Sequence, residues 1–113
     1  MSQITTHILD TSKGRPAENV HIMLQKFEGN DHWKQIAEGQ TNADGRLPGL
    51  LPEDVILEKG IYRLVFDTGN YFKAHHVHGF YPFVPIVFEI QNAEHYHVPL
   101  LLNPYGYSTY RGS

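Results

Sequence analysis

The chain has 113 residues, with 12 acidic and 9 basic side chains and a formal net charge of −3. This length fits one domain, residues 1–113, and the charge balance excludes the strongly basic surface that is typical of nucleic-acid binding. The sequence has no cysteine, which excludes disulfides and thiolate metal sites, and its apolar runs are shorter than the about 20 residues of a membrane-spanning helix.

The start of the sequence bears on the expected location of the protein. Residues 1–10 have neither the charged n-region nor the apolar h-region of a secretory signal peptide. The absence of cysteine fits a reducing compartment, and the last residues differ from a Ser-Lys-Leu peroxisomal signal. We therefore expect a cytoplasmic protein without membrane association.

Alternation of apolar and polar residues predicts β-strands in most of the chain. In residues 4–10 the even positions are mostly apolar, so Thr5 and His7 face away from the expected core. Further strands are expected at residues 19–29, 33–41, 46–50, 61–67 and 86–91. Turn-forming residues separate several of them, at 11–15, 30–31 and 42–45, and a charged loop is expected at 53–60.

One short helix is predicted at residues 70–78. The preceding segment 68–70 offers an N-cap residue, and Gly79 suits the position just after a helix C-terminus. Pro82 and Pro85 prevent a helix from continuing further.

The end of the chain predicts a β-hairpin. Residues 95–102 alternate so that His95 and His97 share the face opposite an apolar one. The Asn-Pro-Tyr-Gly sequence that follows is typical of a turn, and residues 107–111 are suited to a returning strand. Its second arm carries three polar features: Tyr110, Arg111 and the terminal carboxylate.

Together these elements indicate the fold class. Seven to eight short strands, turns about every ten residues and one short helix are typical of an all-β, two-sheet β-sandwich. No linker, repeat or low-complexity segment divides the chain, so one domain is expected over residues 1–113.

The His95-x-His97 pair is the first candidate for chemistry. The two histidines could simply be surface residues on a polar strand face. With His7 from another strand they could hold a zinc ion that keeps one position open for water. Alternatively, neutral histidines could act as general base and orienting partner without metal, because a pKa near 6.5 suits proton transfer at neutral pH. The residues alone leave these interpretations open.

Arg46 and the C-terminus are the other candidates. An arginine after a turn is usually solvated, but beside a histidine cluster the planar guanidinium of Arg46 would suit an anionic or carbonyl-rich heterocycle. The residues from Tyr110 to the end could be no more than a strand end. However, Arg111, the Ser113 hydroxyl and the terminal carboxylate would lie within reach of one site.

Several segments spread over almost the whole chain carry a family resemblance. They are Thr-His-Ile-Leu-Asp (6–10), Gly-x-Pro-Ala (14–17), Thr-Asn-Ala-Asp-Gly-Arg (41–46), Asp-Thr-Gly-Asn-Tyr-Phe (67–72), Phe-Tyr-Pro (80–82), His-Tyr-His-Val-Pro-Leu-Leu-Leu (95–102) and Tyr-Arg-Gly-Ser (110–113). With these motifs the chain resembles the transthyretin-related family, in particular its 5-hydroxyisourate hydrolase branch. The closing Tyr-Arg-Gly-Ser is the most specific motif, because the hormone carriers of the family lack it and lack the matching histidines.

The resemblance implies a transthyretin-like sandwich of two four-stranded sheets, with a short helix after the fifth strand. It also implies a homotetramer, a dimer of dimers, with the active sites at the dimer–dimer interface. The implied reaction, in urate breakdown, is hydrolysis of 5-hydroxyisourate to 2-oxo-4-hydroxy-4-carboxy-5-ureidoimidazoline, with no metal and no cofactor. The implied catalytic residues are His7, Arg46, His97 and Ser113. The implied substrate contacts are His7, Arg46, His97, Tyr110 and Arg111, and the role of His95 is left open.

Three other interpretations compete with this one. The first is a transthyretin-like carrier of a small ligand, against which the polar set of His7, Arg46 and His97 argues. The second is a zinc hydrolase that uses His7, His95 and His97. The third is a sandwich with a purely structural role.

Overall fold

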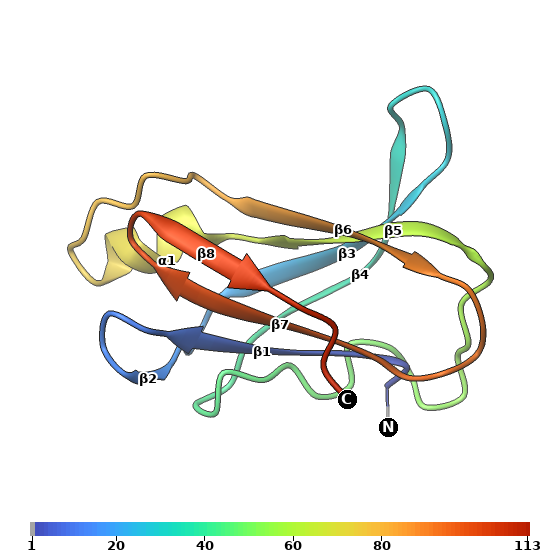
Figure 1. The fold of residues 1–113 in the computed structure, drawn as a ribbon, viewed down its shortest axis with the longest axis horizontal. Helices are drawn as coiled ribbons and strands as arrows, with labels where there is room; N and C mark the ends of the chain where they lie inside the picture. The colour runs from blue at the N-terminus through green and yellow to red at the C-terminus, as the bar shows by residue number, and fades with distance from the viewer. Residues whose placement is uncertain (1) are drawn as a thin grey trace.

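The computed structural model describes residues 2–113 and contains eight strands and one helix (Figure 1). The strands are β1 (Ile4–Asp10), β2 (Arg15–Pro16), β3 (His21–Phe27), β4 (Trp33–Gln40), β5 (Gly60–Phe66), β6 (Val84–Ile90), β7 (Tyr96–Asn103) and β8 (Gly106–Thr109). The helix α1 (Thr68–Ala74) follows β5. Among the described residues, none belongs to a helix that is both long and apolar enough to cross a bilayer.

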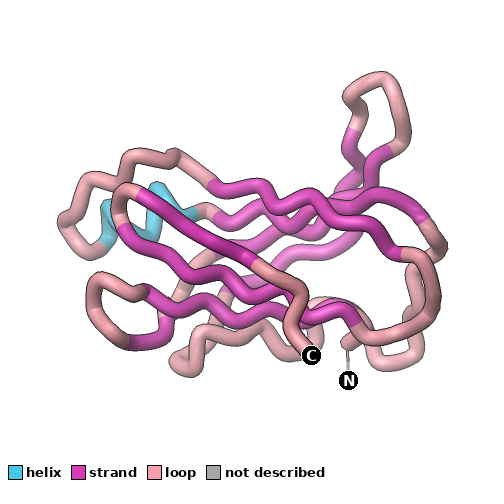
Figure 2. The backbone as a smooth tube through the Cα atoms, in the orientation of Figure 1, coloured by secondary structure: helices cyan, strands magenta, loops and turns pink. Residues whose placement is uncertain are grey.

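The strands form two sheets of four, in the orders β2-β1-β7-β8 and β4-β3-β5-β6. Strands β1 and β7 are parallel neighbours, and every other pairing in the two sheets is antiparallel. Figure 2 shows the two layers of strands with the helix at one end. The prediction of a two-sheet all-β sandwich with one short helix after the fifth strand is confirmed.

The core follows the period-two pattern of the sequence. Along β1 and β7 every even-numbered side chain is buried, while Thr5, His7 and His97 are only half-buried on the outer face. Each large apolar side chain buried between the sheets contributes about 1.5–3 kcal/mol. The prediction that His7 and His97 lie outside the core is confirmed, so this outer face can carry a binding or catalytic site.

The helix was predicted at residues 70–78, and this was wrong at both ends. It begins earlier because the Asp67 carboxylate caps it. It ends earlier because His76 adopts a left-handed conformation, φ 60°, and donates its N–H to the Lys73 carbonyl at 3.0 Å. That is the C-terminal arrangement usually made by glycine. Gly79 has a different role, because a Cβ there would lie 2.7 Å from the ring of Phe72.

Two further local predictions were wrong. The turn expected at 11–15 is shorter, because its last residue begins β2, which pairs with the end of β1. The strand expected at 46–50 is reduced to one bridge between Arg46 and His7. The following Pro48 has no N–H to extend a ladder, and the chain turns there.

Candidate active site

Three of the predicted site residues, His7, Arg46 and His97, are brought together on the outer face of the β2-β1-β7-β8 sheet. Arg46 forms an antiparallel bridge with His7, and Thr5 lies opposite His97 in the parallel pairing of β1 and β7. On the other side of β7, Gly112 forms an antiparallel bridge with His97. Residues paired across neighbouring strands project to the same face. Four segments of the chain therefore meet on this face in two adjacent rows, Arg46 with His7 and Thr5 with His97 and Gly112.

A tight turn holds Arg46 beside His7. The Asn42 side-chain oxygen accepts hydrogen bonds from the backbone N–H of Asp44 at 2.9 Å and of Arg46 at 3.1 Å. Gly45 has a φ of +73°, and its carbonyl accepts the Ile8 N–H at 2.8 Å. A Cβ at Gly45 would collide with the Ile8 carbonyl oxygen. Only glycine allows the turn to approach β1 this closely and set Arg46 beside it.

A threonine hydroxyl links the two histidines of the His-x-His pair. Thr5 Oγ1 lies 2.8 Å from His97 Nδ1 and 2.8 Å from His95 Nε2. The two rings are nearly parallel, at 22°, with centroids 6.3 Å apart. Thr5 was not predicted to be a functional residue. The available indication was its position on the same strand face as His7.

The environment of His97 favours its neutral form. Burial lowers the pKa of His97, and the nearby charges of Arg46, His95 and His7 lower it further. Both effects disfavour a proton on the ring. At neutral pH this imidazole therefore has a lone pair that can accept a proton.

The C-terminus closes over the His97 ring. The Gly112 N–H donates to the His97 carbonyl at 2.9 Å, and a Cβ at Gly112 would lie 2.5 Å from His97 Cδ2. The absence of a side chain thus lets the chain lie against the ring. Ser113, the next residue, is exposed. Gly112 was overlooked as a site residue, although it lies within the Tyr-Arg-Gly-Ser motif.

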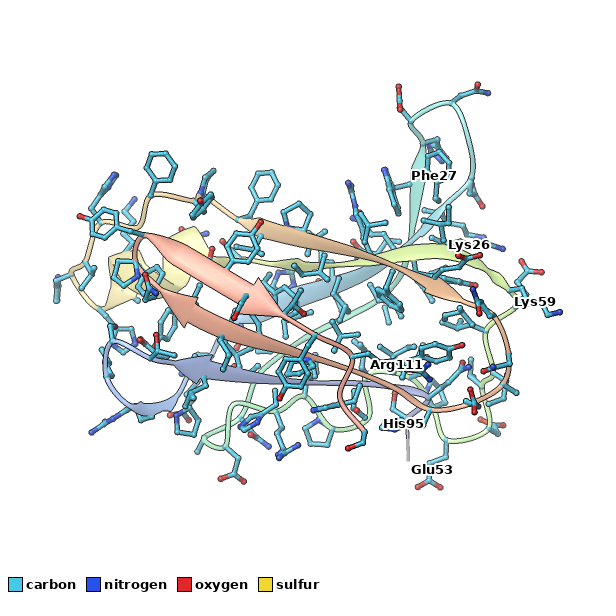
Figure 3. All side chains as sticks on the ribbon, viewed as in Figure 1. Lys26, Phe27, Glu53, Lys59, His95 and Arg111 are labelled. Carbon is cyan, nitrogen blue, oxygen red and sulfur yellow. The ribbon has the colours of Figure 1, made fainter. Side chains whose placement is uncertain are left out.

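The side chains of Tyr110 and Arg111 make other contacts in the single chain. The Arg111 guanidinium stacks over the buried Tyr96 ring, 4.4 Å from its centroid, and donates to the His95 carbonyl at 3.4 Å. Figure 3 labels Arg111 and His95 near the C-terminal end of the chain. Tyr110 is 59% exposed and lines, with Arg111, a groove of about 400 Å³ beside β6. The structure does not bring these two side chains to the histidine rings, and their role in substrate binding stays a prediction.

The histidines are not arranged as a zinc site. Within residues 2–113, no three His, Cys, Asp or Glu side chains are placed to hold one metal ion together. His95 Nε2 and His97 Nδ1 both contact the Thr5 hydroxyl. The geometry therefore does not support the zinc site of His7, His95 and His97 that the sequence left open.

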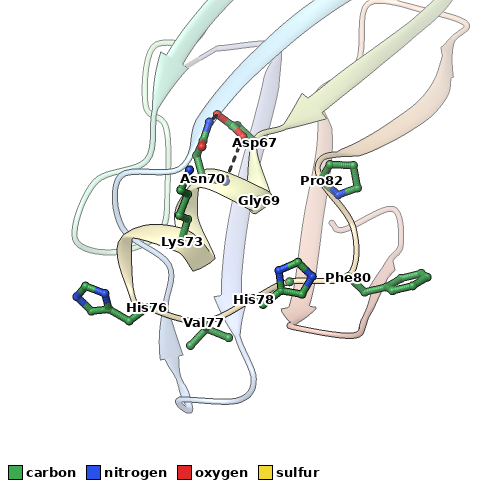
Figure 4. A pocket seen from close by; sticks show the side chains of 10 residues that line it. Asp67, Gly69, Asn70, Lys73, His76, Val77, His78, Phe80 and Pro82 are labelled. Atoms are coloured by element: carbon green, nitrogen blue, oxygen red, sulfur yellow. Dashed lines mark hydrogen bonds between the residues drawn. The ribbon is translucent and has the colours of Figure 1, made fainter.

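A cavity of about 590 Å³ lies away from these residues, at the end of α1 (Figure 4). It is lined by Asp67, Asn70, Lys73, His76, His78 and Phe80, among others. It contains none of the predicted site residues. His76 and His78 thus belong to a separate part of the surface.

Named relatives resemble the chain over almost its whole length. A 5-hydroxyisourate hydrolase of Salmonella dublin is 46% identical over 111 residues, which are 97% of this chain and 80% of that protein. A 5-hydroxyisourate hydrolase of Mus musculus is 45% identical over 114 residues, covering 99% of this chain and 96% of the relative.

Solved structures of two kinds share the fold. Sea bream transthyretin in complex with thyroxine has a TM-score of 0.91 at 32% identity, covering 98% of this chain and 95% of that one. The 5-hydroxyisourate hydrolase of Klebsiella pneumoniae has a TM-score of 0.86 at 39% identity, covering all of both chains. The model of the HIUase/Transthyretin family matches residues 4–112. With the sandwich, the site motifs and these similarities in agreement, the chain belongs to the HIUase/Transthyretin family.

Proposed function

We propose that this protein is a 5-hydroxyisourate hydrolase, which acts in urate breakdown by opening a ring of its substrate at a cyclic amide. The observation that carries the proposal is the half-buried His97, with its lowered pKa, beside His7 and Arg46 on one face. The names of the Salmonella and mouse relatives support the same activity.

His97 is the proposed general base. Hydrolysis of a cyclic amide needs a base for water, stabilisation of the oxyanion and a proton for the leaving nitrogen. Neutral His97 takes a proton from a water molecule as its oxygen bonds to the ring carbonyl carbon. The carbon–nitrogen bond then breaks, and the His97 imidazolium returns the proton to the leaving nitrogen. The product carries the released N–H and a new carboxylic acid, which ionises to the carboxylate by losing its proton to solvent.

The neighbouring residues bind and orient the reactants. The Arg46 guanidinium holds the oxygens of the substrate and offsets the negative charge that develops on the attacked carbonyl. His7, which pairs with Arg46 in the β-bridge, contacts the ring of the substrate from β1. Ser113, through its hydroxyl or its terminal carboxylate, positions the water. Tyr110 and Arg111 are further substrate contacts, and for Arg111 this requires that its guanidinium leave the Tyr96 ring.

We further propose that the active enzyme is a cytoplasmic homotetramer, a dimer of dimers, that needs neither metal nor cofactor. Arg46, His95 and Ser113 are exposed in the single chain. Water weakens charge interactions on such an open face. An interface between copies of this face would exclude water and strengthen the contacts of Arg46 with substrate oxygens. Sedimentation of the active protein tests this, and a fully active monomer would refute it.

A small-ligand carrier is the second candidate function. The observation that favours it is the TM-score of 0.91 with a transthyretin bound to thyroxine. However, two histidines and an arginine on the candidate face suit a polar heterocycle better than an apolar ligand. Saturable thyroxine binding without any hydrolysis of 5-hydroxyisourate would favour the carrier.

The proposed base is tested by a pair of variants. 5-Hydroxyisourate is generated from urate with urate oxidase, and its decay is followed by ultraviolet absorbance. His97→Asn should lower the catalysed rate by roughly 10²- to 10⁴-fold, the contribution of a positioned acid–base group. His32→Asn is the control, because His32 lies on the β3–β4 hairpin, where its ring pairs with Glu28 at 3.5 Å. A His97→Asn protein with the wild-type rate would exclude His97 as the base.

A further inference from the structure

We propose that Thr5 is a positioning residue that holds neutral His97 with its hydrogen on Nδ1 and its Nε2 lone pair free, and that His95 accepts the Thr5 hydroxyl hydrogen. The inference deepens the proposed function and rests on it, because a free Nε2 is what the general base requires. It also gives a role to His95, the member of the histidine pair whose role the motifs left open.

The Thr5 hydroxyl has a single hydrogen but lies between two histidine nitrogens. Thr5 Oγ1 is 2.8 Å from His97 Nδ1 and 2.8 Å from His95 Nε2. A threonine hydroxyl has one hydrogen and can also accept. It therefore donates to one of the two ring nitrogens and accepts from the other. When both rings are neutral, one of the two facing nitrogens carries a hydrogen and the other does not.

Two arrangements satisfy this contact. In one, Thr5 donates to His97 Nδ1, so the His97 hydrogen lies on Nε2 and the ring cannot accept a proton there. In the other, His97 Nδ1–H donates to Thr5, Thr5 donates to His95 Nε2, and His97 Nε2 is free. Only the second arrangement gives a base. It also persists when His97 is protonated at Nε2, because Nδ1–H still donates to the hydroxyl.

The surroundings fix the His97 ring more firmly than the His95 ring. Gly112 lies against the Cδ2 edge of His97, and Thr5 contacts the Nδ1 edge. Turning the His97 ring over would exchange these edges and place a carbon against the hydroxyl. His95 is exposed in the single chain, so its ring is less confined than that of His97. The Thr5 hydroxyl thus links the exposed His95 ring, which can change its tautomer, to the confined His97 ring.

The charged and titratable groups that face His97 would be unchanged by removal of the hydroxyl. They are Arg46 from the turn, His7 from β1 and His95 just before β7. A Thr5→Val variant preserves the β-branched shape of the side chain, so the strand is expected to fold. A change in His97 would then report the lost hydrogen bond.

Thr6 offers a matched control. It is the next residue of β1, points to the buried face, and donates its hydroxyl to the Val98 carbonyl of β7 at 2.7 Å. Thr6→Val removes a hydroxyl–β7 hydrogen bond as Thr5→Val does, but on the opposite face. It should lower the melting temperature and leave the tautomer of His97 unchanged.

The test measures the tautomer and the kinetics of the full-length protein. Nitrogen-15 shifts of the His97 ring, in long-range proton–nitrogen spectra, distinguish a bare nitrogen from an N–H. We expect bare Nε2 in wild type, an increased Nε2–H population in Thr5→Val, and the wild-type pattern in Thr5→Ser. For 5-hydroxyisourate hydrolysis, kcat should fall roughly 10- to 100-fold in Thr5→Val with little change in KM, as when the partner of a metal-bound histidine is removed. Thr5→Ser should restore most of kcat.

Three results would overturn the proposal. They are a His97 ring with hydrogen on Nε2 in the wild type, wild-type His97 shifts and kcat in Thr5→Val, and an equal loss of kcat in Thr5→Val and Thr6→Val. If the wild-type protein does not hydrolyse 5-hydroxyisourate, the proposed function fails. The nitrogen shifts would still show separately whether Thr5 sets the tautomer.

Discussion

Replacing Gly112 with alanine should impair catalysis with little effect on folding. The added Cβ would lie 2.5 Å from Cδ2 and 3.2 Å from Cγ of the His97 ring. Carbon atoms in contact prefer about 3.5–4.0 Å, so the ring or the C-terminal segment must move by about 1 Å. A misplacement of about 1 Å can cost about 10²-fold in rate. We therefore expect kcat for 5-hydroxyisourate to fall by up to about 100-fold in Gly112→Ala.

The stability change in this variant should be small. Gly112 has no left-handed φ, so alanine adds no backbone strain there. The hydrogen bond at risk, from the Gly112 N–H to the His97 carbonyl, contributes about 0.5–1.5 kcal/mol. Gly106→Ala is the control, because a Cβ at Gly106 meets its neighbours at an ordinary 3.8 Å. Wild-type kcat in Gly112→Ala, or an equal loss in Gly106→Ala, would refute the reasoning.

Three further predictions concern charge, turn geometry and a buried carboxylate. Arg46→Gln should raise the pKa of His97, because a positive charge that opposes protonation is lost; a proton NMR titration that finds no rise contradicts this. The wild-type fold holds the His97 proton less tightly than the unfolded chain, so His97 costs stability as the pH falls below about 6.5, and Arg46→Gln should reduce that cost in melts at several pH values. Gly45→Ala should destabilise the fold by about 1–3 kcal/mol, from the positive φ and the collision with Ile8; unchanged denaturant midpoints would argue against it. Burial opposes ionisation of Asp10, but hydrogen bonds to its carboxylate prevail and lower its pKa. The stability that this carboxylate provides should be present above about pH 4 and lost as the pH falls through the lower folded pKa. Asp10→Asn should cost about 1–3 kcal/mol in thermal unfolding and flatten this acid dependence, and an Asn variant with wild-type acid sensitivity would show that another group causes it.

The strand faces could be predicted because their cause is local. In β1 the alternation of buried and half-buried residues follows from the two-residue period of an extended chain. The same period placed His97 outside the core before any partner strand was known. The family motifs then identified Arg46 and the C-terminus as members of the same site.

Contacts set by tertiary pairing could not be predicted in this way. The contact of Thr5 with His95 joins residues 90 positions apart and depends on the parallel pairing of β1 with β7. The end of the helix depends on His76 adopting a conformation that propensity assigns to glycine. The stacking of Arg111 on Tyr96 likewise needs the path of the chain after β8.

The most direct test of the central claim is the decay of 5-hydroxyisourate with wild-type protein that has first been treated with a chelator. The account predicts decay faster than the spontaneous reaction, in proportion to protein concentration and undiminished by chelation. Activity that disappears on chelation and returns with zinc would contradict the proposed metal-free mechanism, in which His97 is the base. Decay no faster than the spontaneous reaction would contradict the proposed function itself.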